Sequence, residues 1–220
     1  MILHTLSVGY KRPIVEAIEG TLNPGDFVCL TGRNGSGKST LLKTLAGLLP
    51  PLQGSIGLDD KRLSDFTPSE LARRVGLVVT RVPDLPNTTL RELVAYGRLP
   101  YASWFGKFSA SDYEAADRAI ATLGISHLTS RLVSELSDGE RQKAMIARAL
   151  AQGTDYLLLD EPSAFLDYES KQELMQMLKN LATEQKKAIL LSSHDQDLVL
   201  RYADIIWNIT DGKLTLKDVK

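Results

Sequence analysis

The feature that most constrains this chain is an eight-residue run that follows a short apolar segment. Residues 32–39 read Gly-Arg-Asn-Gly-Ser-Gly-Lys-Ser and match the pattern G-x-x-x-x-G-K-[ST] at every specified position. The apolar run 27–31 precedes them and the Leu-rich run 41–45 follows, which predicts a strand, a tight turn and a helix in that order. In this arrangement the N–H groups of the turn and the positive end of the helix converge on phosphate oxygens.

This loop predicts a nucleotide site. Its glycines let the backbone approach phosphate oxygens, Lys38 supplies a point charge to the β- and γ-phosphates, and the Ser39 hydroxyl is a ligand for Mg²⁺. The loop therefore predicts a nucleotide with Mg²⁺ as the bound cofactors. The residues of the loop that we expect to bind nucleotide are Arg33, Asn34, Gly35, Ser36, Gly37, Lys38 and Ser39.

A second site is predicted where the apolar run 156–159 ends in Asp160 and Glu161. Asp160 is positioned at the end of the strand to hold Mg²⁺ through water, and Glu161 to orient and deprotonate an attacking water. The glycine-rich loop alone is compatible with kinases, GTPases and many ATPases. The acidic pair reduces the number of enzyme classes that fit the sequence.

Composition excludes several other classes of protein. The 220 residues include 26 Lys and Arg against 27 Asp and Glu, for a formal net charge of −1, which argues against a non-specific nucleic-acid binder. Cys29 is the single cysteine, so an intrachain disulfide and a Cys-based zinc site are excluded, and we expect it to be a small buried side chain. Apolar runs are far shorter than the roughly 18 residues of a membrane helix, and the N-terminus does not resemble a secretory signal.

Apolar segments alternate with helical patterns and predict an α/β fold with a mainly parallel sheet. The expected buried strands are 27–31, 76–79, 156–159, 188–192 and 205–209. A helix over about 168–185 would carry an apolar stripe of Leu174, Met177, Leu178 and Leu181. Short β-like pieces in 1–10, 14–22, 54–59 and 205–217 predict a small antiparallel sheet beside the parallel core, and 86–150 is predicted to be an inserted, mostly helical subdomain.

The order of motifs resembles that of ATP-binding-cassette (ABC) ATPases. After the glycine-rich loop come Leu-Ser-Asp-Gly-Glu-Arg-Gln at 136–142, the acidic strand, Ser-Ala-Phe-Leu-Asp at 163–167 and Ser-His-Asp at 193–195. The resemblance covers nearly the whole chain. It implies a P-loop NTPase fold of the ABC type, with a RecA-like parallel-sheet core, a small antiparallel β region and a helical subdomain at about 86–150. All of 1–220 would then be a single ABC ATPase domain.

The resemblance also implies roles for single residues. Tyr10 matches an aromatic that stacks on adenine, Thr40 joins Lys38 and Ser39 as a phosphate and Mg²⁺ contact, and His194 matches a histidine that reaches the γ-phosphate and Glu161. In this family two subunits pack head to tail. Each ATP lies between the glycine-rich loop of one subunit (the P-loop, here 32–39) and the signature segment of its partner (here 136–142). The residues implied to cross that interface are Ser137, Gly139 and Asp167.

Two positions depart from the family pattern. The signature has Asp138 and Glu140 where glycine and glutamine are usual, and these carboxylates stabilise a helix start while placing negative charge where an anion must dock. We therefore hypothesise a weaker ATP-driven dimer. The second departure is Thr80, which stands where the family has a glutamine that touches Mg²⁺ and senses the membrane partner. Thr80 is a candidate metal contact through water.

The stretch 90–101, followed by Trp104, Gly106 and Ser109, looks like the helical subdomain of importer ATPases for ferric siderophores, haem or cobalamin. The resemblance implies a transmembrane permease and a second ATPase subunit as partners, no contact with the transported substrate, and a peripheral place on the cytoplasmic face of the inner membrane. The aromatic residues near Trp104 either pack a loop or grip the permease. The alternative is a soluble ABC ATPase that acts on nucleic acid or ribosomes without a permease.

Overall fold

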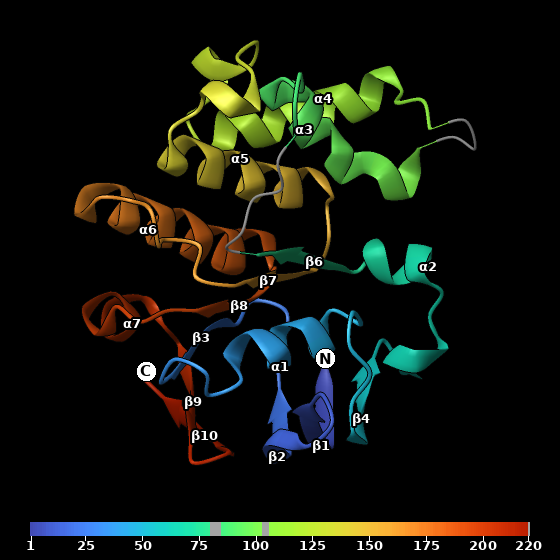
Figure 1. The fold of residues 1–220 in the computed structure, drawn as a ribbon, viewed down its shortest axis with the longest axis vertical. Coiled ribbons are helices and arrows are strands. Elements are labelled where there is room, and N and C mark those ends of the chain that lie inside the picture. The colour runs from blue at the N-terminus through green and yellow to red at the C-terminus, as the bar shows by residue number, and fades with distance from the viewer. Residues whose placement is uncertain (80–84, 103–105, 220) are drawn as a thin grey trace.

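The computed structural model describes residues 1–79, 85–102 and 106–219. The predictions made for Thr80 and Trp104 fall outside these residues. Ten strands form one sheet in the order β5-β4-β1-β2-β10-β9-β3-β8-β7-β6, and helices cover both of its faces (Figure 1). Among the described residues no helix is long and apolar enough to cross a membrane.

The parallel part of the sheet confirms the predicted α/β core. Strands β9, β3, β8, β7 and β6 follow one another in that order and pair in parallel. Strands β7 and β8 are buried at every position, as expected for strands with helices on both faces. The bounds are β3 Phe27–Gly32, β6 Val75–Val78, β7 Tyr156–Leu159, β8 Ala188–Ser192 and β9 Ile205–Thr210.

The small antiparallel β region that the sequence predicted is present: β1 pairs antiparallel with β2 and β4, and β4 pairs antiparallel with β5, within the same sheet as the parallel core. Strand β10 pairs antiparallel with β9 and also meets β2 in parallel through Lys213 and Glu16. This contact joins the antiparallel region of β1, β2, β4 and β5 to the parallel core in one continuous sheet, because the β9–β10 hairpin places β10 between β9 and β2. The remaining bounds are β1 Ile2–Gly9, β2 Pro13–Thr21, β4 Gln53–Leu58, β5 Lys61–Arg62 and β10 Lys213–Asp218.

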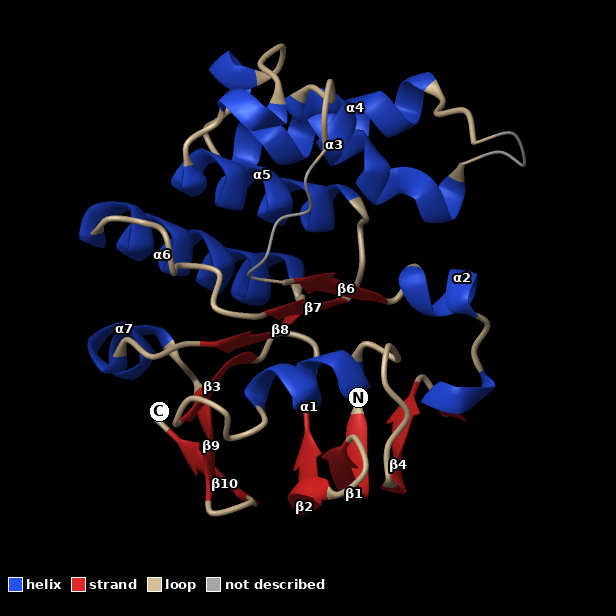
Figure 2. Cartoon of the chain, viewed as in Figure 1, coloured by secondary structure: helices blue, strands red, loops and turns tan. Residues whose placement is uncertain are grey.

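The helices lie in layers around this sheet. Figure 2 shows α3, α4 and α5 together above β6 and β7, while α1 lies on the opposite side of the sheet. The α-helix bounds are α1 Lys38–Leu45, α2 Pro68–Ala72, α3 Leu90–Ala95, α4 Ala110–Thr122, α5 Asp138–Ala151, α6 Tyr168–Gln185 and α7 Gln196–Tyr202. The short 3₁₀ helices are Leu63–Asp65, Tyr96–Tyr101, Ser126–Leu128 and Val133–Glu135.

Alternation along the strands divides the interior into two hydrophobic cores. In β3, Phe27 and Cys29 face the core shared with α3, α4, α5 and α6, while Val28 and Leu30 face the core shared with α1 and the N-terminal strands. This is the period-two pattern of a strand that is covered on both faces. The prediction that Cys29 is a small buried side chain is therefore confirmed.

The predicted apolar stripe of α6 is rotated slightly. Leu174, Leu178 and Leu181 are buried as expected, but Met175 takes the fourth place and Met177 is only partly buried. The helix packs between the sheet and the layer that contains α5, so its buried face is wider than one strict i, i+3, i+4, i+7 stripe.

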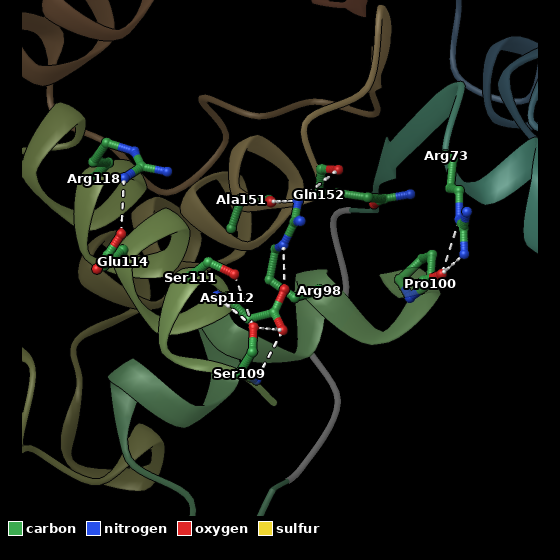
Figure 3. Close-up of polar contacts among 10 residues, drawn as sticks. All are labelled: Arg73, Arg98, Pro100, Ser109, Ser111, Asp112, Glu114, Arg118, Ala151 and Gln152. Atoms are coloured by element: carbon green, nitrogen blue, oxygen red, sulfur yellow. Dashed lines mark hydrogen bonds and ion pairs between the residues drawn. The ribbon is translucent and has the colours of Figure 1, made fainter. Parts of the chain in front are cut away.

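An arginine joins the segment after α3 to two other helices. The Arg98 Nε lies 3.1 Å from the Asp112 Oδ1, and the Arg98 Nη1 donates to the Ala151 carbonyl at 3.0 Å. Asp112 in turn accepts from the backbone N–H and hydroxyl of Ser109, which caps α4. Figure 3 shows Arg98 pointing between α4 and the end of α5. One largely buried cation therefore holds three helical elements together.

The same segment is also fixed to the sheet. The Arg73 Nε and Nη2 donate to the Pro100 carbonyl at 2.9 and 2.7 Å, and the Gln152 Nε2 donates to the carbonyls of Ala72 and Val75. Arg73 and Gln152 thus connect the helical layer to α2 and β6 (Figure 3).

At Gly97 the 3₁₀ helix Tyr96–Tyr101 lies directly against the backbone of α5. We predict that Gly97→Ala destabilises the protein. A Cβ at this position would lie 2.1 Å from the Arg148 carbonyl oxygen, so the 3₁₀ turn must move away from α5. Overpacking of this kind costs about 1–3 kcal/mol, to be measured by urea unfolding. The matched control is Gly57→Ala, whose Cβ would meet Ile2 at an ordinary 3.8 Å. Equal effects of the two substitutions would contradict the prediction.

Candidate functional site

The glycine-rich loop runs from the end of β3 to the start of α1, as the sequence predicted. Gly37 has a φ of 106°, and a Cβ there would lie 2.9 Å from side-chain carbons of both Ile14 and Val15. Glycine is required because the loop passes this close to β2 in a left-handed conformation. The loop therefore reaches the first turn of α1 with its N–H groups at the helix start.

Lys38 is folded back into the loop. Its Nζ donates to the Gly32 carbonyl at 2.9 Å and to the Arg33 carbonyl at 3.2 Å. Burial lowers the pKa of Lys38, and the charges of Glu161 and Asp160 oppose that effect. The Ser36 hydroxyl is also buried, with no hydrogen-bond partner in the described part of the chain. A buried cation and an unpaired hydroxyl in one loop suit an incoming anion.

The two acidic residues lie at the carboxyl end of β7. The Ser192 hydroxyl, at the end of the adjacent β8, donates to the Asp160 Oδ1 at 2.8 Å and accepts from the Glu161 N–H at 2.9 Å. Glu161 has a φ of 50°, a left-handed conformation that is uncommon for a residue with a side chain. Ser192 thus fixes the carboxylate of one residue and the backbone of the next.

His194 completes this edge of the sheet. Its Nε2 lies 2.7 Å from the Glu161 Oε1, and the two side chains are 42% and 33% exposed. The pair is therefore open to solvent and to a substrate, whereas Asp160 beside it is only 9% exposed. The sequence placed Glu161, Asp160 and His194 in one site, and the structure brings these three residues together.

The other residues predicted on this subunit lie around the loop. Tyr10 is 62% exposed in the turn between β1 and β2, and the first residues of β2 contact the loop at Gly37. On α1, Ser39 is exposed and Thr40 is buried. Asp167 caps α6 by accepting from the Ser170 N–H at 2.8 Å.

The signature residues lie elsewhere. Ser137 caps α5 through a reciprocal contact with Glu140, whose Oε2 accepts from the Ser137 N–H at 2.8 Å and from its hydroxyl at 2.9 Å. Gly139, in the first turn, lies against the segment that contains Leu166. Figure 1 places α5 in the helical layer on the far side of the sheet from α1. One chain therefore does not bring its own signature to its own P-loop.

Ser192 is the residue that the sequence analysis missed. A polar side chain at the end of the otherwise apolar run 188–192 was a usable signal. Because the carboxyl ends of neighbouring parallel strands meet at one edge of a sheet, a hydroxyl there lies close to the acidic pair. The strand order was needed to show that β8 is the neighbour of β7.

Oxygen atoms dominate the groups that are available to a metal ion. The predicted ligands are the Ser39 hydroxyl and the Asp160 carboxylate, a hard donor set that fits Mg²⁺. Within residues 1–79, 85–102 and 106–219 no group of three or more His, Cys, Asp or Glu side chains is arranged to hold a metal.

Together, a phosphate-binding loop with a buried lysine after β3 and an acidic pair after β7, two strands away in the same parallel sheet, define a P-loop nucleoside triphosphatase. The sequence profile described as ABC transporter matches residues 15–164. The chain belongs to the ABC transporter family and is one of its ATP-binding ATPase domains.

Two relatives and one solved structure illustrate the similarity. An uncharacterised ABC transporter ATP-binding protein of Methanocaldococcus jannaschii is 43% identical over 210 residues, which are 95% of this chain and 72% of that protein. The ferric enterobactin transport ATP-binding protein FepC of Escherichia coli is 37% identical over 95% of this chain and 78% of its own length. A dimeric ATP-binding cassette in a post-hydrolysis state with ADP and Pi has a TM-score of 0.86 and 26% identity, covering 100% of this chain and 98% of that chain.

The position of Ser192 predicts an effect on turnover. Ser192→Ala leaves the Glu161 N–H without its acceptor, which costs about 1–3 kcal/mol. We expect kcat for ATP hydrolysis to fall about tenfold, since about 1.4 kcal/mol corresponds to tenfold, while nucleotide affinity changes little. Ser126→Ala, at an exposed position of the helical layer, is the control. Lower nucleotide affinity with unchanged kcat would show that Ser192 does not position Glu161.

Proposed function

We propose that this chain is the ATP-hydrolysing subunit of a membrane ABC importer that takes up an iron-siderophore, haem or cobalamin-type chelate. The observation that carries the hydrolytic part is the 2.7 Å contact between Glu161 and His194 at the edge of the sheet that also bears Asp160. The relative named for ferric enterobactin transport supports the class of cargo. The whole segment 1–220 would act as one ABC ATPase domain, with 86–150 as its helical subdomain.

The reaction follows from the positions of these side chains. Glu161 orients a water molecule and accepts its proton as the water oxygen attacks the γ-phosphorus of ATP. The bond between that phosphorus and the β,γ-bridging oxygen breaks, and ADP leaves with the electron pair. His194 holds Glu161 and donates toward the γ-phosphate, while Lys38 leaves the loop carbonyls and neutralises phosphate charge. The contribution of the protein is positioning and electrostatic stabilisation.

Ser39 and Asp160 are the residues that would hold Mg²⁺. When bound, the ion neutralises charge on the β- and γ-phosphates. Arg33, Asn34, Gly35, Ser36, Gly37 and Thr40 would surround the phosphates, and Tyr10 would stack on adenine. Thr80 remains a candidate for water-mediated contact with the ion.

Head-to-tail dimerisation is part of this proposal. Ser137 and Gly139 lie in the helical layer, and α1 lies on the other side of the sheet, so a second copy is needed to place a signature over each P-loop. The start of α5 offers backbone N–H groups and the positive end of the helix dipole to a γ-phosphate. Asp167 would cross the same interface.

An apolar pocket supports a membrane partner. A pocket of about 610 Å³ lies between the end of α1, α2, β4 and the end of α5, and Leu48, Leu49, Pro50, Phe66 and Leu71 are among its lining residues. Leu48 is 65% exposed, and exposed apolar surface of this kind marks interaction sites. A permease segment docked here would hold the chain at the cytoplasmic face of the inner membrane, away from the cargo.

The alternative remains a soluble ABC ATPase that acts on nucleic acid or ribosomes. The formal net charge of −1 argues against it, because nucleic-acid binders carry basic faces.

Two substitutions test the function. Glu161→Gln keeps the shape of the side chain but removes the base, which is expected to lower kcat at least about 100-fold while ATP still binds. Lys38→Ala is expected to lower affinity for ATP as well. Both are measured by phosphate release and by nucleotide binding with the purified chain and with membranes that contain its permease.

The partner that stimulates ATP hydrolysis distinguishes the two candidate functions. The importer predicts faster hydrolysis with permease-containing membranes and no response to nucleic acid or ribosomes. Full turnover by both variants would disprove the hydrolytic site, and stimulation by nucleic acid or ribosomes alone would favour the soluble alternative.

The acidic signature gives a further prediction. Hydrogen bonds from the Ser137 N–H and hydroxyl lower the pKa of Glu140, so its carboxylate is ionised at neutral pH next to the proposed γ-phosphate position. Asp138→Gly combined with Glu140→Gln is expected to lower the half-saturating ATP concentration about fivefold, as a change of about 1 kcal/mol would do. Glu114→Gln on the exposed face of α4 is the control, and an unchanged ATP requirement would refute the hypothesis.

A further inference from the structure

His194 lies in a short turn whose backbone determines where its side chain points. Residues 193–195 join β8 to α7 and belong to neither element. The imidazole is partly exposed, so packing against its neighbours does not by itself fix its orientation. The 2.7 Å contact between the His194 Nε2 and the Glu161 Oε1 therefore depends on where this turn is held.

The residues on either side of His194 are held by hydrogen bonds. The Ser193 N–H donates to the Leu30 carbonyl at 3.1 Å, which extends the pairing of β8 with β3. The Asp195 N–H donates to the Ser193 Oγ at 3.1 Å, and the Asp195 Oδ1 accepts from the Leu198 N–H at 3.4 Å. The last of these bonds is long for an N–H donor, so α7 alone holds this carboxylate weakly.

A lysine of α6 faces the other oxygen of the same carboxylate. The Lys171 Nζ lies 3.6 Å from the Asp195 Oδ2, and the two side chains are 27% and 26% exposed. Figure 1 shows α6 and α7 side by side. Because water screens a largely buried ion pair less than a surface pair, this contact holds the start of α7 against α6.

The position of Lys171 in its own helix points to a role outside that helix. Asp167 caps α6 and Glu169 lies in its first turn, and both acidic residues complement the positive end of the helix dipole. Lys171 is the fourth residue of α6 and brings a positive charge toward the same end, which the dipole disfavours. Such a conflict with local electrostatics is expected where a contact with another element compensates for it, and Asp195 supplies that contact.

We infer that Lys171 is a positioning residue for ATP hydrolysis: its ion pair with Asp195 fixes the turn that bears His194. The inference rests on the proposed function, in which that imidazole acts together with Glu161. Ser192 already holds the Glu161 backbone, and Lys171 gives the other member of the pair a separate anchor. The two anchors come from different elements, β8 and α6.

Removal of the positive charge tests this role. Lys171→Met keeps the length of the side chain and breaks the ion pair. We expect kcat for ATP hydrolysis to fall about fivefold, which corresponds to about 1 kcal/mol. The affinity for ATP is expected to change less than about twofold, because the P-loop is unaltered. Lys171→Arg keeps the charge and is expected to retain at least about half of kcat.

The matched control is Lys179→Met on the same helix. Lys179 pairs with Asp204, and this pair is more deeply buried than that of Lys171. Asp204 accepts from the Phe27 N–H at the amino end of β3, opposite the edge that carries the candidate site. Loss of the control pair is expected to lower the free energy of unfolding and to leave kcat within about twofold. Equal falls in kcat for the two variants would overturn the inference, since general loosening of α6 would explain both.

A double-mutant cycle tests the path through Asp195. Asp195→Asn keeps an oxygen to cap α7 and removes the negative charge. If Lys171 acts through this carboxylate, Asp195→Asn lowers kcat about as much as Lys171→Met, and the double variant shows no further fall. Falls that multiply would overturn the inference, because they mean that the two residues act independently.

A measurement without ATP separates this inference from the proposed function. The chain contains three histidines, so comparison with His194→Ala identifies the ring signals of His194 in the NMR spectrum. Lys171→Met is expected to broaden these signals, because the turn is no longer fixed, whereas Lys171→Arg and Lys179→Met leave them unchanged. Unaltered His194 signals in Lys171→Met would overturn the inference. If the wild-type chain hydrolyses no ATP while these signals still respond to Lys171→Met, the proposed function fails and the anchoring of His194 stands.

Discussion

The parallel pairing of β3, β8 and β7 is the constraint on which the candidate site depends. These neighbouring strands point the same way, so the P-loop after β3, His194 after β8 and the acidic pair after β7 all emerge at one edge. Ser192 then couples two of the strands by bonding to both Asp160 and Glu161. Because the strands are buried on both faces, helix packing maintains their register and hence the distances between these side chains.

The helical layer has a different relation to this edge. Gln152 attaches it to α2 and β6, and Arg98 joins α4 to the end of α5 within it. Helix α5 presents Ser137 at its start. In the proposed head-to-tail dimer the layer would present Ser137 to the P-loop of a second copy, since α1 lies on the other side of the sheet.

Much of the site was predictable because its residues act through local geometry. The loop 32–39 needs only a strand before it and a helix after it, and both could be recognised from apolar periodicity. The continuity of the sheet was missed, because one bridge between Lys213 and Glu16 leaves no pattern in either strand. The rotation of the buried face of α6 was missed as well, since it depends on which elements pack against that helix.

The sequence by itself determined the phosphate loop, the acidic strand end, the lone histidine and their order, because each is a short motif whose chemistry resides in consecutive residues. Only the tertiary structure decided that Ser192 supports Glu161, that Arg98 joins α4 to the end of α5, and that β10 joins the two parts of the sheet. These are relations between residues that are distant in the chain. Strand order, helix packing and the exclusion of water create them, and no local pattern encodes any of the three.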